Sequence, residues 1–182
     1  MKETILKKFA TWSVAVLLIF FGGYLLLTQI APSLLGGLFE KSSETRMQAP
    51  PFVLRDISGG SKGLADFSGK NIVLLFWTTW NEVSFDELKI LSNLPSDLLH
   101  GKNVALVAVN SLEEGSQVLA AVERFNNKEI TYLLDADGAA SEAYNAGVLP
   151  LLVFVDKNGF IVKKVTGPTA QKNLKSIIKD FR

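Results

Sequence analysis

Hydrophobic and polar positions divide the chain into one long apolar segment near the N-terminus and a region of shorter apolar runs. Residues 9–31 (FATWSVAVLLIFFGGYLLLTQIA) carry no charged side chain. At a rise of about 1.5 Å per residue, roughly 20 apolar residues cross the hydrocarbon core of a bilayer. Phe9–Ala31 is therefore predicted to be a transmembrane helix, with Trp12 and Tyr24 placed toward the two interfaces.

Positive charges on either side of this segment predict its orientation. Three lysines lie among the first eight residues, whereas Lys41 and Arg46 follow at a distance and beside glutamates. This bias places the basic N-terminus, residues 1–8, in the cytoplasm and the region after the span outside it, on the periplasmic or cell-surface side. The apolar run is longer than the core of a cleavable signal peptide, and no A-x-A site follows it. We therefore expect an uncleaved signal anchor in a single-pass membrane protein.

After a tether at 32–48, continuous apolar runs alternate with segments of helical periodicity, which predicts a folded domain at 49–182. Strands are expected at 52–54, 71–77, 104–109, 130–133, 151–155 and 160–165. Helices are expected at 82–98, 113–126, 139–146 and 169–181. Strands separated by helices indicate an α/β domain with a mainly parallel sheet, and a turn at Lys157-Asn158-Gly159 adds an antiparallel edge strand.

Composition excludes several kinds of chemistry. None of the 182 residues is cysteine, which excludes disulfides, thiolate catalysis and cysteine-based metal sites. The single histidine, His100, is expected in a loop and cannot build a histidine-rich metal site. The net charge of +1 and the absence of a basic aromatic patch argue against nucleic-acid binding. We expect neither a metal nor another cofactor.

Four motifs follow one another along the domain: APPFVL at 49–54, LADFSGKNIVLLFWTTW at 64–80, DADG at 135–138 with Tyr144, and PLLVFVDKNG at 150–159. In this order and spacing they resemble the thioredoxin superfamily. Within it they are most similar to the membrane-anchored extracytoplasmic redoxins, which are related to the alkyl hydroperoxide reductase/thiol-specific antioxidant family and include thiol–disulfide oxidoreductases of cytochrome c maturation. The resemblance implies a thioredoxin-like fold, with a mixed central sheet and flanking helices.

The resemblance breaks down at the reactive positions. Where those proteins have W-C-x-x-C, this chain has Trp80 followed by Asn81 and, three residues later, Ser84. Neither an amide nor an unactivated hydroxyl can enter thiol–disulfide exchange, and peroxide reduction also needs a thiolate. Asn81 is instead predicted to cap the following helix, because asparagine is among the best N-cap residues. A nucleophilic Ser84 would need an adjacent base, for which the sequence offers no suitable histidine.

In the resembling proteins, the proline that corresponds to Pro150 follows a cis peptide bond and faces the cysteines. The backbone beside that proline pairs with an extended segment of the partner protein. The candidate groove residues here are Trp77, Trp80, Asn81, Ser84, Leu149, Pro150 and Leu151. Two other interpretations stay open: Pro150 only shapes the loop before a strand, and the tryptophans belong to the core or its rim. Local hydrogen bonding in turns, rather than a cation site, is expected of Asp66, Asp135, Asp137 and Asp156.

Three functions are compatible with these observations. The first is a membrane-tethered, non-catalytic module whose partner is an envelope protein or an extended peptide bound at the groove. The second is the thiol–disulfide or antioxidant role of the resembling family, exerted only through a partner's cysteines. The third is a structural or assembly subunit that binds through another face.

Overall fold

The computed structural model describes residues 46–125 and 127–181, together with Phe21 and Tyr24. The chain divides into two units, Met1–Thr45 and Arg46–Arg182. The basic N-terminus 1–8, the transmembrane helix expected at Phe9–Ala31 and the tether up to residue 45 therefore lie outside the described residues, apart from Phe21 and Tyr24. Within the part of the chain that is described, no helix is long and apolar enough to cross a membrane.

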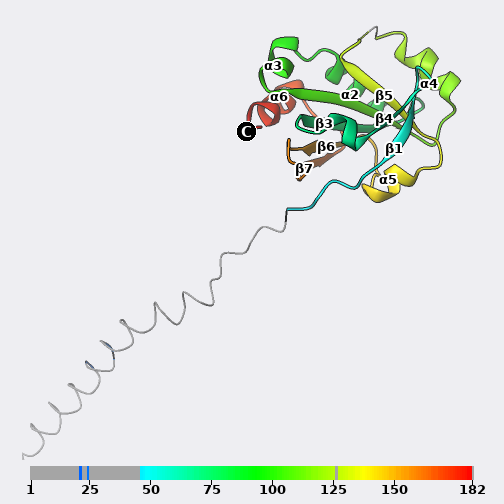
Figure 1. The fold of residues 1–182 in the computed structure, drawn as a ribbon. Coiled ribbons are helices and arrows are strands. Elements are labelled where there is room, and N and C mark those ends of the chain that lie inside the picture. Colours follow the sequence, from blue (N-terminus) through cyan, green and yellow to red (C-terminus); the bar gives the residue numbers. More distant parts are fainter. Residues whose placement is uncertain (1–20, 22–23, 25–45, 126, 182) are drawn as a thin grey trace, which may run out of the picture. The chain divides into compact units, whose positions relative to one another are not determined.

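The second unit is an α/β domain (Figure 1). Its strands are β1 (Val53–Asp56), β2 (Ser61–Gly63), β3 (Asn71–Trp77), β4 (Val104–Ser111), β5 (Ile130–Asp135), β6 (Leu151–Val155) and β7 (Ile161–Thr166). Its helices are α2 (Glu82–Ser92), α3 (Ser96–Gly101), α4 (Gly115–Val122), α5 (Ala139–Ala143) and α6 (Gln171–Lys179), with a 3-10 turn at Leu64–Phe67. The strands predicted at 71–77 and 151–155 are confirmed, whereas the short polar strand β2 was not predicted.

The sheet is more mixed than the mainly parallel one predicted. Its strand order is β2-β1-β5-β4-β3-β6-β7. Only β3, β4 and β5 run parallel, and an antiparallel pair of strands continues the sheet on each side. The sequence pattern indicates which runs are buried strands, but it does not reveal the direction in which β1 and β6 join their neighbours.

The hydrophobic core lies on both faces of the sheet, because successive side chains of a strand point to opposite faces. On β3, Val73, Leu75 and Trp77 pack in a cluster with apolar side chains of α2, α3, α4 and α6. Leu74 and Phe76 belong to a second cluster, which contains side chains of α5 and of the segment before β1. Figure 1 shows α5 on the other side of the sheet from α2.

The single helix predicted at 82–98 is wrong. The structure has two helices, α2 ending at Ser92 and α3 beginning at Ser96, with Pro95 at the N-cap of α3. Proline has no amide hydrogen and disfavours a helical conformation in the residue before it. His100, predicted to lie in a loop, is in fact exposed in the last turn of α3, where Nε2 lies 3.5 Å from Glu129 Oε2.

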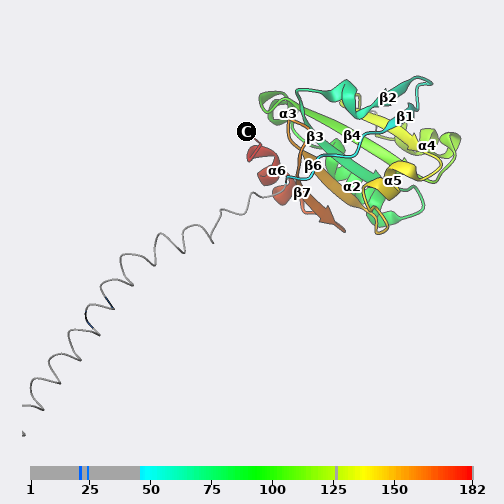
Figure 2. The same ribbon diagram turned by 60° about the horizontal axis from the view of Figure 1, so that its bottom comes forward.

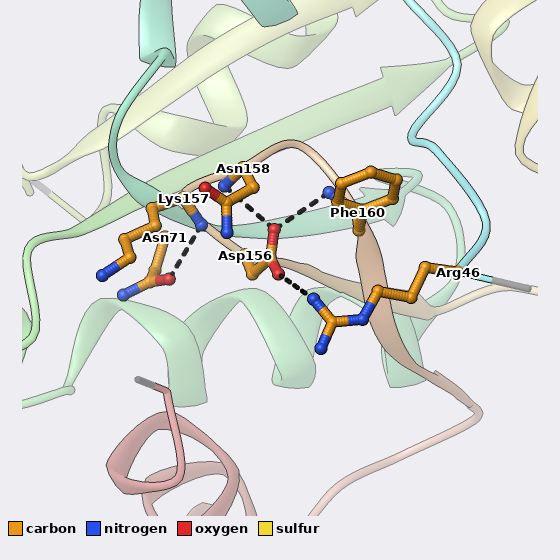
Figure 3. Close-up of polar contacts among 6 residues, drawn as sticks. All are labelled: Arg46, Asn71, Asp156, Lys157, Asn158 and Phe160. Atoms are coloured by element: carbon orange, nitrogen blue, oxygen red, sulfur yellow. Dashed lines mark hydrogen bonds and ion pairs between the residues drawn. The ribbon is translucent and has the colours of Figure 1, made fainter. Parts of the chain in front are cut away.

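The predicted turn between the last two strands is confirmed. Gly159 has a positive φ of 84°, a conformation that glycine adopts readily, and β6 and β7 pair antiparallel. Asp156 Oδ1 accepts hydrogen bonds from the amides of Asn158 at 2.9 Å and Phe160 at 3.0 Å (Figure 3). The other oxygen, Oδ2, lies 3.7 Å from Nη1 of Arg46, the first residue of the second unit (Figure 3).

The local roles predicted for the other aspartates are also confirmed. Asp66 accepts a hydrogen bond from the amide of Gly63. Asp135 accepts hydrogen bonds from two amides in the first turn of α5, and Asp137 accepts one from Ala139.

Candidate functional site

The site begins at the loop between β3 and α2. Asn81 is the N-cap residue of α2, and its Oδ1 accepts a hydrogen bond from the amide of Ser84 at 3.1 Å. This bond satisfies one of the amides that have no partner in the first turn of a helix. The capping role predicted for Asn81 is therefore confirmed, and α2 begins here without the cysteine that the resembling proteins have at this position.

The loop before β6 lies against this helix start. The Leu149–Pro150 peptide bond is cis. Asn81 Nδ2 donates a long hydrogen bond of 3.4 Å to the carbonyl oxygen of Leu149. Asn81 and the proline loop, which are 68 residues apart in sequence, are thus brought together as the sequence resemblance implied.

Burial divides the seven candidate groove residues. Trp80 has 73% of its surface exposed, and Asn81 and Leu149 are half-buried. Trp77, Ser84, Pro150 and Leu151 are buried. Trp77 packs in the core, with its ring 6.4 Å from that of Phe85.

The exposed surface therefore consists of Trp80, Asn81 and Leu149 with two neighbouring valines, Val83 and Val148; we name these five residues the Trp80 surface. Val83, in the first turn of α2, is 44% exposed. The buried side of α2 is formed instead by Ser84, Glu87, Leu88 and Leu91.

A carboxylate that sequence reasoning missed holds the β3–α2 loop. Glu113, in the loop after β4, accepts hydrogen bonds of 2.6 Å from the amide of Thr79 and from Asn110 Nδ2. Its other oxygen accepts a hydrogen bond from the Thr79 hydroxyl. Hydrogen bonds to a charged acceptor are stronger than neutral ones. Glu113 thus fixes the residue immediately before Trp80, from a position 34 residues away in sequence.

A second missed carboxylate lies beneath the helix start. Glu87, one turn after Ser84 on α2, is almost fully buried, and its Oε2 accepts a hydrogen bond of 2.7 Å from the amide of Thr169. Burial raises the pKa of Glu87 above its usual value, and the hydrogen bond from Thr169 opposes this increase only in part. The only sequence signal was an acidic residue within the apolar stripe of α2.

The arrangement offers little for catalysis. No residue of the chain can supply a thiolate. The Ser84 hydroxyl is fully buried, and among the described residues it has no hydrogen-bond partner that could act as a base. His100 is in α3, next to the loop that enters β4, whereas Ser84 is beyond the end of β3, which runs parallel to β4. The two residues therefore lie at opposite ends of the sheet.

Solved structures share this architecture. The secreted Mycobacterium tuberculosis disulfide oxidoreductase homologous to E. coli DsbE is similar with a TM-score of 0.61 and 26% identity, over 70% of this chain and 94% of that one. The pneumococcal exposed lipoprotein thioredoxin Etrx1, from Streptococcus pneumoniae strain TIGR4, is similar with a TM-score of 0.63 and 22% identity, over 72% and 100%. The domain thus has a thioredoxin-like α/β fold, with a mixed sheet and flanking helices.

Sequence relatives identify the family. The thiol-disulfide oxidoreductase ResA of Geobacillus thermodenitrificans strain NG80-2 is 31% identical over 136 residues, covering 74% of this chain and 76% of the relative. ResA of Bacillus subtilis strain 168 is 32% identical over 133 residues, covering 73% and 71%. The family model named Redoxin matches residues 44–178. The chain therefore belongs to the Redoxin family, and it is a member without cysteine.

Proposed function

We propose that this chain is a non-catalytic Redoxin-family module, tethered to a membrane of the cell envelope, that binds an extended polypeptide segment of an envelope protein through the Trp80 surface. The observation that carries the proposal is the 73% exposure of Trp80, directly before the helix start and close to the cis proline loop. Tryptophan is among the residues that contribute most to the binding free energy of protein interfaces. Covering a large exposed apolar side chain also removes a large apolar area from water.

The geometry around Trp80 supports an extended partner. Asn81 contacts the Leu149 carbonyl, so the helix start and the loop before Pro150 lie side by side. Glu113 holds Thr79 and thereby limits the movement of the Trp80 backbone. A surface that is already ordered loses less conformational entropy on binding. Backbone groups of the loop before Pro150 then offer strand-like hydrogen bonds to the partner, as in other modes of strand addition.

The proposed membrane attachment rests on the uncharged run Phe9–Ala31 and on the lysines before it. The amide of Ile161 donates to the Met47 carbonyl at 2.8 Å, so the chain enters the domain beside the β6–β7 turn. Pro150 precedes the opposite end of β6. The Trp80 surface therefore lies at the other end of the sheet from Met47. That a similar solved structure is described as secreted agrees with an extracytoplasmic domain.

The relatives suggest an alternative function, because those named ResA are thiol-disulfide oxidoreductases. Exchange proceeds through a mixed disulfide, to which this chain contributes no sulfur. A redox role would therefore require that the cysteines of a bound partner react with each other or with a third protein. Such a role would also depend on polypeptide binding at the Trp80 surface.

The proposal is tested by capturing partners with the tagged full chain from solubilised native membranes and quantifying them by mass spectrometry. Trp80→Ala is compared with Val162→Ala, which truncates an exposed apolar side chain on β7. Truncating an interface hot spot costs about 2 kcal/mol or more, so we expect Trp80→Ala to weaken the affinity for a specific partner roughly 30-fold and to lower its recovery. Val162→Ala should leave recovery unchanged, and an equal effect of the two substitutions would contradict the proposal.

A further inference from the structure

The Trp80 surface continues into a larger apolar area at one end of the sheet. Trp80, Val148 and Leu112 are 73%, 64% and 69% exposed. They lie after β3, before β6 and after β4, and the parallel strands β3 and β4 end at the same edge. Figure 2 shows α4 and α5 together at this end, with α3 and α6 at the other. A single extended segment can therefore contact several of these side chains.

Three segments at this end of the sheet are acidic and contain no lysine or arginine. They are residues 78–86, 112–120 and 136–149, and their charged residues are Glu82, Asp86, Glu113, Glu114, Asp137 and Glu142. The whole chain has a net charge of +1, so this acidity is local rather than a property of the composition. An extended partner lying across the apolar area would run alongside these carboxylates.

Four of these carboxylates are placed to meet a partner. Glu82 is exposed in the first turn of α2, and Glu114 is exposed at the N-cap of α4, where its side chain makes no capping hydrogen bond. Asp137 and Glu142 are exposed just before α5 and within it. Glu113 is not among the four, because it is engaged with the β3–α2 loop.

Three basic side chains near this end of the sheet neutralise its acidic residues only in part. Arg124 lines a cleft of about 510 Å³ between α2 and α4 together with Glu82 and Asp86, so one cation lies with two carboxylates there. Lys164 donates a hydrogen bond of 2.9 Å to the Tyr144 carbonyl, which places one positive charge at the C-terminus of α5. Arg55, on β1, is paired with Leu134 next to the end of β5, two strands away from β3. The six carboxylates of the three segments outnumber these three cations, so the net charge around the apolar area is negative.

From this arrangement we infer the kind of partner that the Trp80 surface accepts: an extended polypeptide with an apolar centre flanked by lysine or arginine. The inference rests on the proposed function and adds charge selectivity to it. The apolar centre covers Trp80, Leu112 and Val148, while the flanking cations lie near Glu82 and Glu114 on one side and near Asp137 and Glu142 on the other. Because these carboxylates are exposed, the selectivity decreases as salt screens the charges.

The test uses the purified full chain in non-ionic detergent and three fluorescent peptides. All three share a four-residue apolar centre, which is flanked on each side by two lysines, two glutamines or two glutamates. Each exposed ion pair contributes only modestly to the binding free energy. Several together should make the lysine peptide bind about tenfold tighter than the glutamate peptide at low salt. Fluorescence anisotropy should place the glutamine peptide between them, and the difference should diminish at high salt.

Matched variants assign the selectivity to this surface. Glu82→Gln combined with Glu114→Gln should reduce the preference for lysine about threefold or more. Asp97→Asn combined with Glu123→Gln removes the same charge from other exposed positions and should leave the preference intact.

The outcomes separate the inference from the proposed function. Equal affinity for the three peptides, abolished alike by Trp80→Ala, would overturn the charge selectivity and leave polypeptide binding in place. The absence of binding by any peptide, or binding unaffected by Trp80→Ala, would contradict polypeptide binding at this surface.

Discussion

Removing the helix cap at Asn81 tests the view that this residue has a structural rather than a chemical role. Asn81→Ala removes the 3.1 Å hydrogen bond to the Ser84 amide and the 3.4 Å contact with the Leu149 carbonyl. Replacing an N-cap asparagine by alanine costs about 1 kcal/mol, and so long a second bond adds at most a few tenths. We therefore predict that the free energy of unfolding falls by about 1 kcal/mol, which corresponds to a Tm lower by roughly 3 °C.

Urea unfolding of the 46–182 unit, followed through the fluorescence of the buried Trp77, measures this change. Asn81→Ser is the matched control, because serine caps a helix about as well as asparagine and removes only the contact with Leu149. The serine variant should stay within about 0.5 kcal/mol of the wild type. An unchanged stability of Asn81→Ala, or an equal loss in both variants, would refute the assignment of Asn81 as a cap.

Three further predictions follow from the side chains around the site. Burial raises the pKa of Glu87 above 4.5, so the folded state holds this proton more tightly than the unfolded state. Its contribution to stability is present below about pH 4.5 and is lost as the pH rises through the raised pKa, and Glu87→Gln should remove that decline in pH-dependent urea unfolding. Glu113→Ala should lower the free energy of unfolding by about 2–3 kcal/mol, because it leaves the Thr79 amide without its charged partner. Asn81→Cys combined with Ser84→Cys should introduce measurable insulin reduction, which the wild type lacks, because both thiols then lie at a helix N-terminus.

Each of these predictions has a result that would contradict it. Identical pH profiles for the wild type and Glu87→Gln would show that burial does not perturb this carboxyl group. A Glu113→Ala variant as stable as the wild type would mean that the loop before Trp80 is held by other contacts. Insulin reduction by the wild type would refute the absence of thiol chemistry, and inactivity of a correctly folded double-cysteine variant would mean that the helix start does not activate a thiol.

The sequence predicted the strands of the core best, because a strand buried on both faces is a continuous apolar run. β3 and β6 have the predicted bounds for this reason. The strand β2 consists of Ser61, Lys62 and Gly63, which carry no apolar signal. The break between α2 and α3 is visible in the sequence as Pro95, because proline interrupts a helix even where the apolar stripe continues.

The candidate site could be predicted only where it depends on local structure. The cap formed by Asn81 joins residues three apart, so the sequence was sufficient to predict it. The positions of Glu113 and Glu87 depend on partners 34 and 82 residues away, and only the folded chain reveals them. The sequence also could not predict which side chains are exposed. Trp77 and Trp80 are the same residue type three positions apart, but Trp77 lies in the core and Trp80 at the surface.

Site-specific photo-crosslinking in native membranes tests polypeptide binding at the Trp80 surface most directly. A photoreactive residue replaces Val148, which lies in this surface, or Val162, which is similarly exposed on β7. We predict a recurrent adduct with one envelope protein from position 148, through an extended segment of that protein, and none from position 162. Adducts from position 162 but not from position 148 would contradict binding at the Trp80 surface and favour a structural subunit that binds through another face.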